Sequence, residues 1–164
     1  MKLLICGKGG CGKSTVAALL AKAMQRRGRR VFLVDADESN IGLYRMLGME
    51  HFGRSLDGLC DHLLCVVDPS FESIMMAKRV KAFAGEANLA VSFVLNRLIP
   101  EAENELSQAL DSVGIIGRLP DSRSIFLNNL KGIPLDLQLP EMESVCDALE
   151  KAVTAGRVAA LVFP

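Results

Sequence analysis

Tryptophan is missing from this sequence of 164 residues, and the other aromatic side chains are few, with seven phenylalanines and one tyrosine. Histidine, a frequent metal ligand and acid–base catalyst, occurs only twice. The 19 basic and 19 acidic residues balance, so the formal net charge is zero. Proteins that bind nucleic acid through its phosphates usually carry an excess of basic residues. The composition therefore predicts no nucleic-acid partner.

Long hydrophobic runs are also missing, although half of the residues are apolar. No run reaches the roughly 18 residues that a membrane-spanning helix needs. The chain starts directly with a predicted strand and shows no secretory signal, and its apolar tail lacks the basic face of a membrane-anchoring helix. Five scattered cysteines, an odd number, favour a reducing compartment over a disulfide framework. We therefore expect a cytoplasmic protein without a membrane partner, folded as a single domain over residues 1–164.

A glycine-rich stretch between a short apolar run and a helical pattern is the strongest signal in the chain. Residues 3–6 indicate a strand, and residues 16–24 have apolar side chains at helical spacing. Between them the sequence matches the phosphate-binding pattern G-x-x-x-x-G-K-[ST], in the strand–turn–helix context that this pattern requires. The predicted nucleotide-binding residues are Gly7, Lys8, Gly9, Gly10, Cys11, Gly12, Lys13, Ser14 and Thr15.

The residue types in this stretch suit a triphosphate. Glycines allow backbone N–H groups to converge on one point, and the following helix adds the positive end of its dipole. Lys13 is placed to contact the β- and γ-phosphates, and Ser14 to put a hydroxyl on Mg²⁺. Lys8 is a second lysine close to the same negative charge, although an exposed solubilising lysine is the alternative. The sequence thus predicts ATP or ADP with Mg²⁺ as the ligand.

Two acidic residues follow the second predicted strand, residues 31–34. Ligands bind at the carboxyl edge of an open α/β sheet, so Asp35 and Asp37 are predicted to face the phosphate site. Carboxylate oxygens are suitable Mg²⁺ ligands, and we assign Asp35 to the metal and Asp37 to the orientation of water. The alternative role is capping of the helix that starts near Ser39, and Asp37 suits both roles.

Apolar runs alternate with helical patterns along the chain. The expected strands are residues 3–6, 31–34, 63–67, 89–95 and 113–117. The expected helices are residues 16–24, 40–47, 55–61, 70–84, 101–110, 122–130 and 140–152. This alternation predicts an α/β domain of three layers with a mainly parallel sheet. The apolar tail, residues 159–163, packs either on the domain or on a partner, and the sequence does not choose between them.

The glycine-rich loop resembles the deviant Walker A loop of the MinD/ParA/nitrogenase-iron-protein class of P-loop ATPases. The chain as a whole looks like the carbon-monoxide-dehydrogenase maturation ATPases, the CooC-like nickel-insertion branch of that class. The stretches that carry the resemblance are Lys8–Thr15, Val34–Asp37 with the residues to Gly48, Glu50–Arg54, Val67–Ser70 and Val94–Arg97. The resemblance implies a P-loop NTPase fold, an ATPase activity, a homodimer and a metalloenzyme client in metallocentre assembly.

The resemblance also implies roles for single residues. In the class, the lysine at the position of Lys8 reaches a nucleotide across a dimer interface. An asparagine at the position of Asn96 contacts adenine. The loop that matches Leu119, Pro120 and Asp121 contacts adenine as well.

One segment of the family is missing from this chain. Between Gly48 and Met49 the family carries a Walker B-like strand with its aspartate, the start of switch II, and a metal-binding Cys-x-Cys pair. That strand would lie between the first and second strands expected here, so the gap must close or a partner must fill it. The remaining cluster, Cys60-Asp61-His62-x-x-Cys65, matches no known zinc framework, and we interpret its cysteines as core residues.

The sequence leaves three functional hypotheses. The first is a dimeric ATPase for metallocentre assembly, in which Lys8 and Lys13 offset the charge that develops on the γ-phosphate. The second is a module that binds nucleotide without hydrolysis, because the second aspartate and switch II are missing. The third is a scaffold that no longer binds nucleotide, and the intact loop argues against it.

Overall fold

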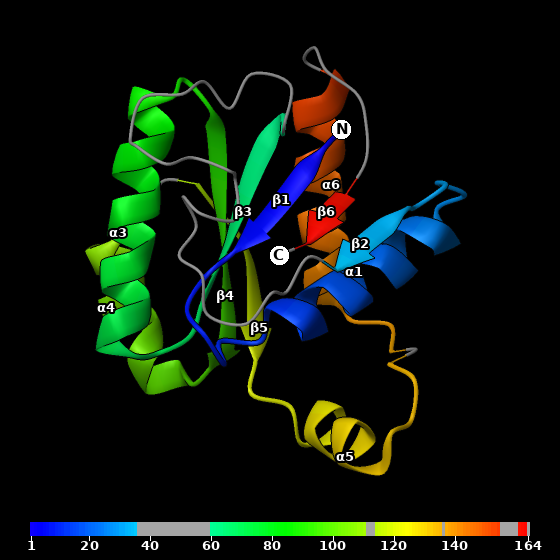
Figure 1. Cartoon of the computed structure of the whole chain (residues 1–164). Coiled ribbons are helices and arrows are strands. Elements are labelled where there is room, and N and C mark those ends of the chain that lie inside the picture. Colours follow the sequence, from blue (N-terminus) through cyan, green and yellow to red (C-terminus); the bar gives the residue numbers. More distant parts are fainter. Residues whose placement is uncertain (36–59, 111–113, 136, 155–160, 164) are drawn as a thin grey trace.

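The computed structural model describes residues 1–35, 60–110, 114–135, 137–154 and 161–163. The predicted helix 40–47 and most of the predicted helix 55–61 lie outside these residues. Strands and helices largely alternate along the described chain (Figure 1). The strands are β1 (Leu3–Cys6), β2 (Leu33–Asp35), β3 (His62–Val67), β4 (Ala90–Leu98), β5 (Ile115–Pro120) and β6 (Leu161–Phe163). The helices are α1 (Lys13–Arg26), α3 (Phe71–Glu86), α4 (Pro100–Ala109), α5 (Arg123–Lys131) and α6 (Pro140–Thr154).

The described strands form one six-stranded sheet in the order β2-β6-β1-β3-β4-β5. Every recorded pairing between them is parallel, which confirms the expected α/β architecture. The five expected strands are present. The sixth, β6, comes from the apolar tail and lies between β1 and β2, where it pairs with both. The tail therefore packs on the domain itself, in the place where the missing family strand was expected.

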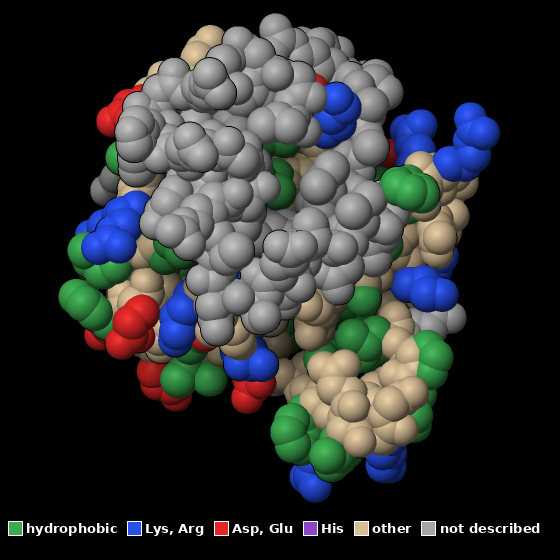
Figure 2. Space-filling model, viewed as in Figure 1, with side chains coloured by type: hydrophobic (Ala, Val, Ile, Leu, Met, Phe, Trp, Pro, Cys, Tyr) green, Lys and Arg blue, Asp and Glu red, His purple; other side chains and the backbone are tan. Residues whose placement is uncertain are grey.

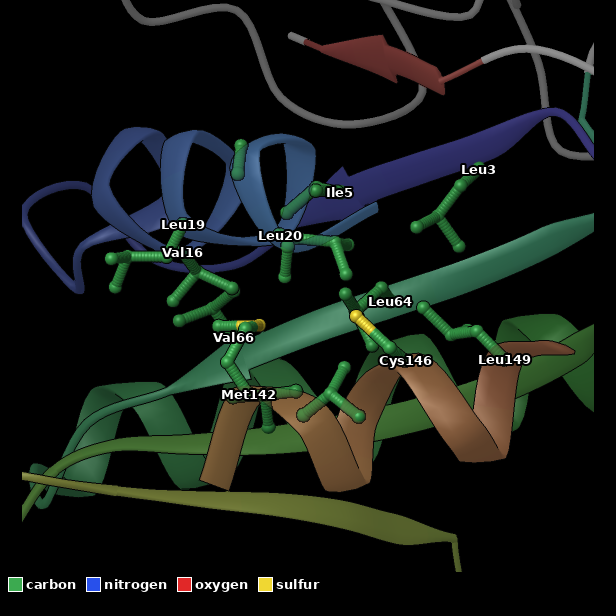
Figure 3. Close-up of a cluster of buried hydrophobic side chains, with 14 of the residues drawn as sticks. Leu3, Ile5, Val16, Leu19, Leu20, Leu64, Val66, Met142, Cys146 and Leu149 are labelled. Atoms are coloured by element: carbon green, nitrogen blue, oxygen red, sulfur yellow. The ribbon is translucent and has the colours of Figure 1, made fainter. Parts of the chain in front are cut away.

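The central strands are hydrophobic along their whole length because helices cover both faces of the sheet. All four residues of β1 and all six residues of β3 are buried. Helices α1 and α6 cover one face, and Figure 3 shows their side chains packed against those of β1 and β3. The opposite face carries α3 and α4, packed on a second cluster that includes Leu63, Val67 and Phe93. Each large aliphatic side chain buried here contributes about 1.5–3 kcal/mol to folding.

Local sequence signals account for where several helices begin and end. Ser70 caps α3, because its Oγ accepts a hydrogen bond from the Ser73 N–H. Ser122 caps α5 in the same way by accepting from the Ile125 N–H. Gly28, with φ of 77°, follows the end of α1 as expected for a glycine that terminates a helix.

Helix α5 differs from the other helices because none of its residues is buried. Figure 1 places it below the layered body of the domain, and Figure 2 shows hydrophobic side chains over the same part of the molecule. Phe126 and Leu130 are 63% and 70% exposed. None of the helices that the structure describes has the length and apolar character needed to cross a bilayer.

The strands that lead to the expected site extend further than the sequence suggests. Strand β4 continues to Leu98, and β5 continues to Pro120, whereas the predicted strands stop at residues 95 and 117. The polar residues at these positions are typical of loops. They remain in the sheet because β4 and β5 pair with each other up to Leu98 and Pro120.

Candidate functional site

The glycine-rich loop leaves the carboxyl end of β1 and leads directly into α1, as the motif requires. Gly7, Gly10 and Gly12 have φ of 146°, 79° and 95°, a region that residues with side chains rarely adopt. A Cβ at Gly7 would overlap the carbonyl oxygen of Val66, and one at Gly12 would overlap the amide of Asn96. Gly7 and Gly12 are needed both for their backbone conformation and for the close approach of neighbouring strands, whereas Gly10 is needed for its backbone conformation alone.

The carbonyl oxygens of the loop are held by donors. The Lys13 Nζ donates to the carbonyl of Gly7 at 3.3 Å and lies 3.5 Å from that of Lys8. The Cys11 N–H donates to the Lys8 carbonyl at 3.2 Å. Because these carbonyl oxygens already accept hydrogen bonds from the protein, other backbone N–H groups of the loop are left to bind an anion. Lys13 itself supplies a positive charge over the first half of the loop.

Two successive residues of β4 hold the second half of the loop. The Asn96 Nδ2 donates to the Cys11 carbonyl at 2.9 Å, and this amide is buried. The Arg97 Nη1 donates to the Gly10 carbonyl at 3.0 Å. The resemblance assigned Asn96 to adenine, and in this structure its amide nitrogen supports the loop. Sequence reasoning missed Arg97, although its place next to Asn96 at a strand end was a usable signal.

Lys8 points toward the start of α3. Its Nζ donates to the Ser70 Oγ at 3.2 Å and lies 3.8 Å from the Glu72 Oε2. The Ser70 hydroxyl in turn donates to the Asp68 Oδ1 at 2.6 Å. Asp68 follows β3, the neighbour of β1, and is only 9% exposed. Sequence reasoning gave neither Asp68 nor Ser70 a site role, although an acidic residue after a buried strand at this edge resembles the signal that singled out Asp35.

The structure describes only some of the residues predicted to act at the Mg²⁺ site. Ser14 is exposed in the first turn of α1, and that turn contains no acidic residue. Asp35 is the last residue of β2 and pairs in register with Phe163, and the structure describes its backbone only. Asp37 lies outside the described residues. A hydroxyl and carboxylates are oxygen donors, so the predicted ligands fit the chemistry of Mg²⁺.

The predicted adenine loop lies at the end of β5, two strands from β3. Leu119 is buried, whereas Pro120 and Asp121 are exposed. The Asp121 N–H donates to the Leu98 carbonyl at 3.1 Å, which ties this loop to the end of β4. The loop thus shares an edge of the sheet with Asn96, and its Leu119 belongs to the same buried cluster as Cys11 of the glycine-rich loop.

Cys60 and Cys65 are core residues, as expected. All five are free thiols and buried. Burial raises the pKa of the Cys11 thiol and raises that of Cys60 to about 11, so both remain protonated at neutral pH. The His62 Nε2 lies 2.9 Å from the Ser92 Oγ. Within the described ranges, no three histidine, cysteine or acidic side chains are grouped so that they could bind a metal ion.

Comparison with known proteins matches most of the chain to a longer relative. An uncharacterized ATP-binding protein of Methanocaldococcus jannaschii is 22% identical over 249 aligned residues, which cover 92% of this chain and all of the relative. Because that alignment is longer than the chain, the relative contains segments with no counterpart here. A second ATP-binding protein of the same organism is 32% identical over 109 residues, and the match spans 63% of this chain and only 43% of that relative.

The likeness to the carbon monoxide dehydrogenase accessory protein CooC of Rhodospirillum rubrum is short. It amounts to 51% identity over 37 residues, or 23% of this chain and 14% of the relative. The expected resemblance of the chain as a whole to the CooC-like ATPases is therefore supported only over a small part of the chain. Membership of the broader nucleotide-binding family is supported over a larger part of the chain.

Solved structures share the fold. The MinD cell division protein of Aquifex aeolicus matches with a TM-score of 0.65 at 18% identity, over 98% of this chain and all of that one. An ATP complex of the Cyanothece protein McdA matches with a TM-score of 0.62 at 15% identity, over 97% and 98% of the two chains. Residues 3–152 match the family described as the CobQ/CobB/MinD/ParA nucleotide binding domain. This match, with which the glycine-rich loop at the carboxyl edge of a parallel sheet agrees, shows that the chain belongs to that nucleotide-binding family.

Proposed function

We propose that the chain binds Mg-ATP at residues 7–15 and hydrolyses it. The observation that carries the proposal is that carbonyl oxygens of the loop already accept hydrogen bonds from other parts of the protein. Donors from Lys13, Asn96 and Arg97 hold carbonyl oxygens of the loop, and the amino end of α1 adds its positive dipole. This arrangement is suited to a polyphosphate because the anion meets donors without having to displace acceptors first.

Lys13 supplies the charge for the reacting phosphate. Its Nζ lies 3.3 Å from the Gly7 carbonyl, within reach of an anion that occupies the same loop. An ammonium group has three N–H donors, so Lys13 can also donate to phosphate oxygens when a triphosphate binds. A charge that is fixed in this position stabilises the negative charge that spreads over the γ-phosphate during attack by water.

Ser14 and Asp35 are the proposed ligands of Mg²⁺, and Asp37 is proposed to orient the attacking water. When bound, the metal neutralises charge on the β- and γ-phosphates. The sheet supports the placement of Asp35, because β6 keeps β2 two strands from β1, or about 10 Å at the usual strand spacing. That is the separation that the family strand between them would also give.

Lys8 is the residue through which we propose a homodimer. Its side chain is 36% exposed, and its present partners are Ser70 and the exposed Glu72. An exposed ion pair of this kind contributes at most about 1 kcal/mol, so Lys8 can leave it for a nucleotide on a second copy at little cost. Asn96 and the loop Leu119–Asp121 are the proposed adenine contacts, supported by their common place at the carboxyl edge of the sheet.

Metallocentre assembly in the cytoplasm is the proposed setting. The support is the short match to CooC and a second one, 43% identity over 49 residues, to an iron-sulfur cluster carrier protein of Methanocaldococcus jannaschii. The free thiols of all five cysteines agree with a reducing compartment. The partner would be a metalloenzyme client that receives the metal centre.

The test is ATP turnover together with nucleotide affinity in wild type and in Lys13→Ala. The variant is expected to lose turnover and to bind Mg-ATP at least tenfold more weakly, because the phosphate loses a fixed charge. Lys22→Ala is the matched control, since Lys22 is an exposed lysine on the same helix. Equal turnover in Lys13→Ala and wild type would contradict the catalytic role.

Nucleotide binding without hydrolysis is the second candidate. It is favoured by the length of the alignment with the archaeal relative, which exceeds this chain. The absent family segment would carry an aspartate and part of switch II, and both serve hydrolysis more than binding. Tight binding of Mg-ADP and Mg-ATP without turnover supports this candidate, and turnover by the isolated chain excludes it.

A further inference from the structure

Asn96 and Arg97 are neighbours in β4, and both side chains bond to the glycine-rich loop. Successive side chains of a regular strand point to opposite faces of the sheet. A regular strand would therefore direct only one of the two residues to the loop. The two recorded bonds, to the carbonyls of Cys11 and Gly10, require a departure from regular geometry at this point.

The structure contains that departure. Leu95 pairs with Arg118 and Leu98 pairs with Pro120, so β4 has one more residue than β5 between these two pairs. Such a β-bulge redirects side chains and is common near functional sites. Arg97 lies in the bulge with φ of 55°, a left-handed conformation that is unfavourable for any residue other than glycine. A strained residue persists where its surroundings hold it in place.

The two bonds determine how the loop presents its N–H groups. Across a trans peptide bond, the carbonyl of one residue and the N–H of the next point in opposite directions. Holding the Cys11 carbonyl against Asn96 turns the Gly12 N–H away from β4. Holding the Gly10 carbonyl against Arg97 fixes the preceding peptide unit, whose N–H belongs to Cys11 and donates to Lys8. Together the bonds fix the peptide units just before α1.

We propose that Arg97 is a positioning residue of the nucleotide site, which holds the Gly10–Gly12 part of the loop in its phosphate-binding conformation before the nucleotide arrives. The inference rests on the proposed function in one respect, namely that the loop binds a nucleotide. Arg97 acts through the loop and does not react. The bulge and the left-handed backbone are the means by which β4 supplies two side chains where a regular strand supplies one.

The experiment measures the loop without nucleotide and the affinity with it. The thiol of Cys11 is fully buried inside the loop, so its labelling by N-ethylmaleimide, read by peptide mass spectrometry, reports loop opening. Cys146 is equally buried but lies in α6 on the core side, so it reports opening of the whole domain. Mg-ADP affinity is measured by calorimetry on the same proteins.

Two substitutions separate the side chain from the backbone. Arg97→Ala removes the guanidinium and keeps the backbone strain, whereas Arg97→Gly removes both. Arg118→Ala is the matched control, because Arg118 is a half-exposed arginine on the adjacent β5 whose Nε donates to Glu103 at 3.0 Å. Both Arg97 variants are expected to label Cys11 severalfold faster relative to Cys146 and to bind Mg-ADP about fivefold more weakly, as for the loss of one hydrogen bond.

The outcomes decide the proposal in each case. The proposal is overturned if Cys11 labelling is unchanged, or if labelling of Cys146 rises equally. It is also overturned if Mg-ADP affinity is unchanged, or if Arg97→Ala causes a change that Arg97→Gly does not share. A wild-type protein that binds no Mg-ADP refutes the proposed function instead. In that event the Cys11 labelling ratio alone decides whether Arg97 holds the loop.

Discussion

Gly12 shows how strictly single positions of the loop are determined. It precedes α1 with φ of 95°, and the amide of Asn96 occupies the space that a Cβ would need. The steric conflict cannot be relieved by rotating Asn96 without breaking its bond to the Cys11 carbonyl. Any side chain at this position therefore disturbs both the backbone conformation and the support from β4.

Gly12→Ala is expected to weaken Mg-ADP binding at least tenfold and to lower the free energy of unfolding by about 1–3 kcal/mol, because a left-handed alanine is strained and crowds Asn96. Calorimetry and chemical denaturation measure the two effects. Gly85→Ala is the control, since Gly85 lies in α3 with an ordinary φ, and a Cβ added there would meet open space. Binding by Gly12→Ala equal to that of the control would contradict this account of the loop.

His62 is a single residue that makes the stability of the fold depend on pH. Burial lowers its pKa, so the imidazole is neutral in the folded protein, with Nε2 2.9 Å from the Ser92 Oγ. The unfolded chain titrates near pH 6.5 and binds the proton more readily than the folded chain does. The neutral imidazole of His62 thus contributes to the free energy of unfolding above about pH 6.5, and this contribution is lost as the pH falls below that value.

Denaturation measured between pH 7.5 and about pH 5 should show a falling free energy of unfolding, with a slope of up to about 1.4 kcal/mol per pH unit from this one proton. In His62→Gln the slope should become smaller, because glutamine does not titrate. His51→Gln, which removes the other histidine, is the comparison. An identical slope in wild type and His62→Gln would show that another group is responsible.

At the scale of the element, β6 joins two parts of the sheet. It pairs with Leu3 and Leu4 of β1 on one side and with all three residues of β2 on the other. Among the described strands, β2 has no other partner in the sheet. The attachment of β2, and with it the position of Asp35, therefore depends on three residues at the end of the chain.

Val162→Pro removes a backbone N–H from β6 and should destabilise the protein by about 2–3 kcal/mol. Hydrogen exchange of residues 33–35 and 3–4 should accelerate in this variant, while exchange in β4 and β5 changes little. Val162→Ile retains the N–H and the branched side chain, so it should behave as wild type. Unchanged protection of β2 in the proline variant would mean that β6 does not hold it.

Arg27 links two helices of one layer. Its guanidinium lies 2.6 Å from the Glu143 carboxylate, 2.7 Å from Asp147 and 3.1 Å from Glu150, which joins the end of α1 to α6. The side chain is 23% exposed, so solvent screens the network in part.

Arg27→Ala should lower the free energy of unfolding by about 1 kcal/mol, and the loss should shrink at 1 M salt. Arg30→Ala removes an exposed residue of the same charge from the same segment and serves as the control. Thermal denaturation at low and high salt makes the comparison. A loss that is independent of salt would assign the effect to packing instead of charge.

At the scale of the whole molecule, the sequence was sufficient for the fold class and for the strand–loop–helix context of the glycine-rich stretch. Both depend on short-range signals, namely apolar runs such as Leu3–Cys6 and the glycine–lysine–serine spacing of residues 7–14. The core face of α1 was likewise predictable from its helical period, and Val16, Leu20 and Met24 are buried. These features can be predicted from short stretches of sequence without knowledge of tertiary contacts.

The features that the sequence did not reveal depend on distant contacts. Strand β6 has only three residues, too few for a periodic pattern, and its place follows from the partners β1 and β2. Arg97 follows the predicted strand and was therefore expected in a loop. Its role depends on a bulge that forms only when β4 pairs with β5, and such pairing is not visible in the sequence. Asp68 and Ser70 became part of the site only through the contact with Lys8, 62 residues from Ser70.

The most direct test of the central claim compares ligands that differ only in their phosphates. Calorimetric titration with Mg-ATP, Mg-ADP and adenosine should give tight binding of both nucleotides and affinity for adenosine at least a hundredfold weaker, because the loop amides and Lys13 contact the phosphates. Hydrogen exchange of residues 8–15 should slow when Mg-ADP is present. Equal affinity for adenosine and ADP, or unchanged exchange in the loop, would contradict the assignment of residues 7–15 as a phosphate site.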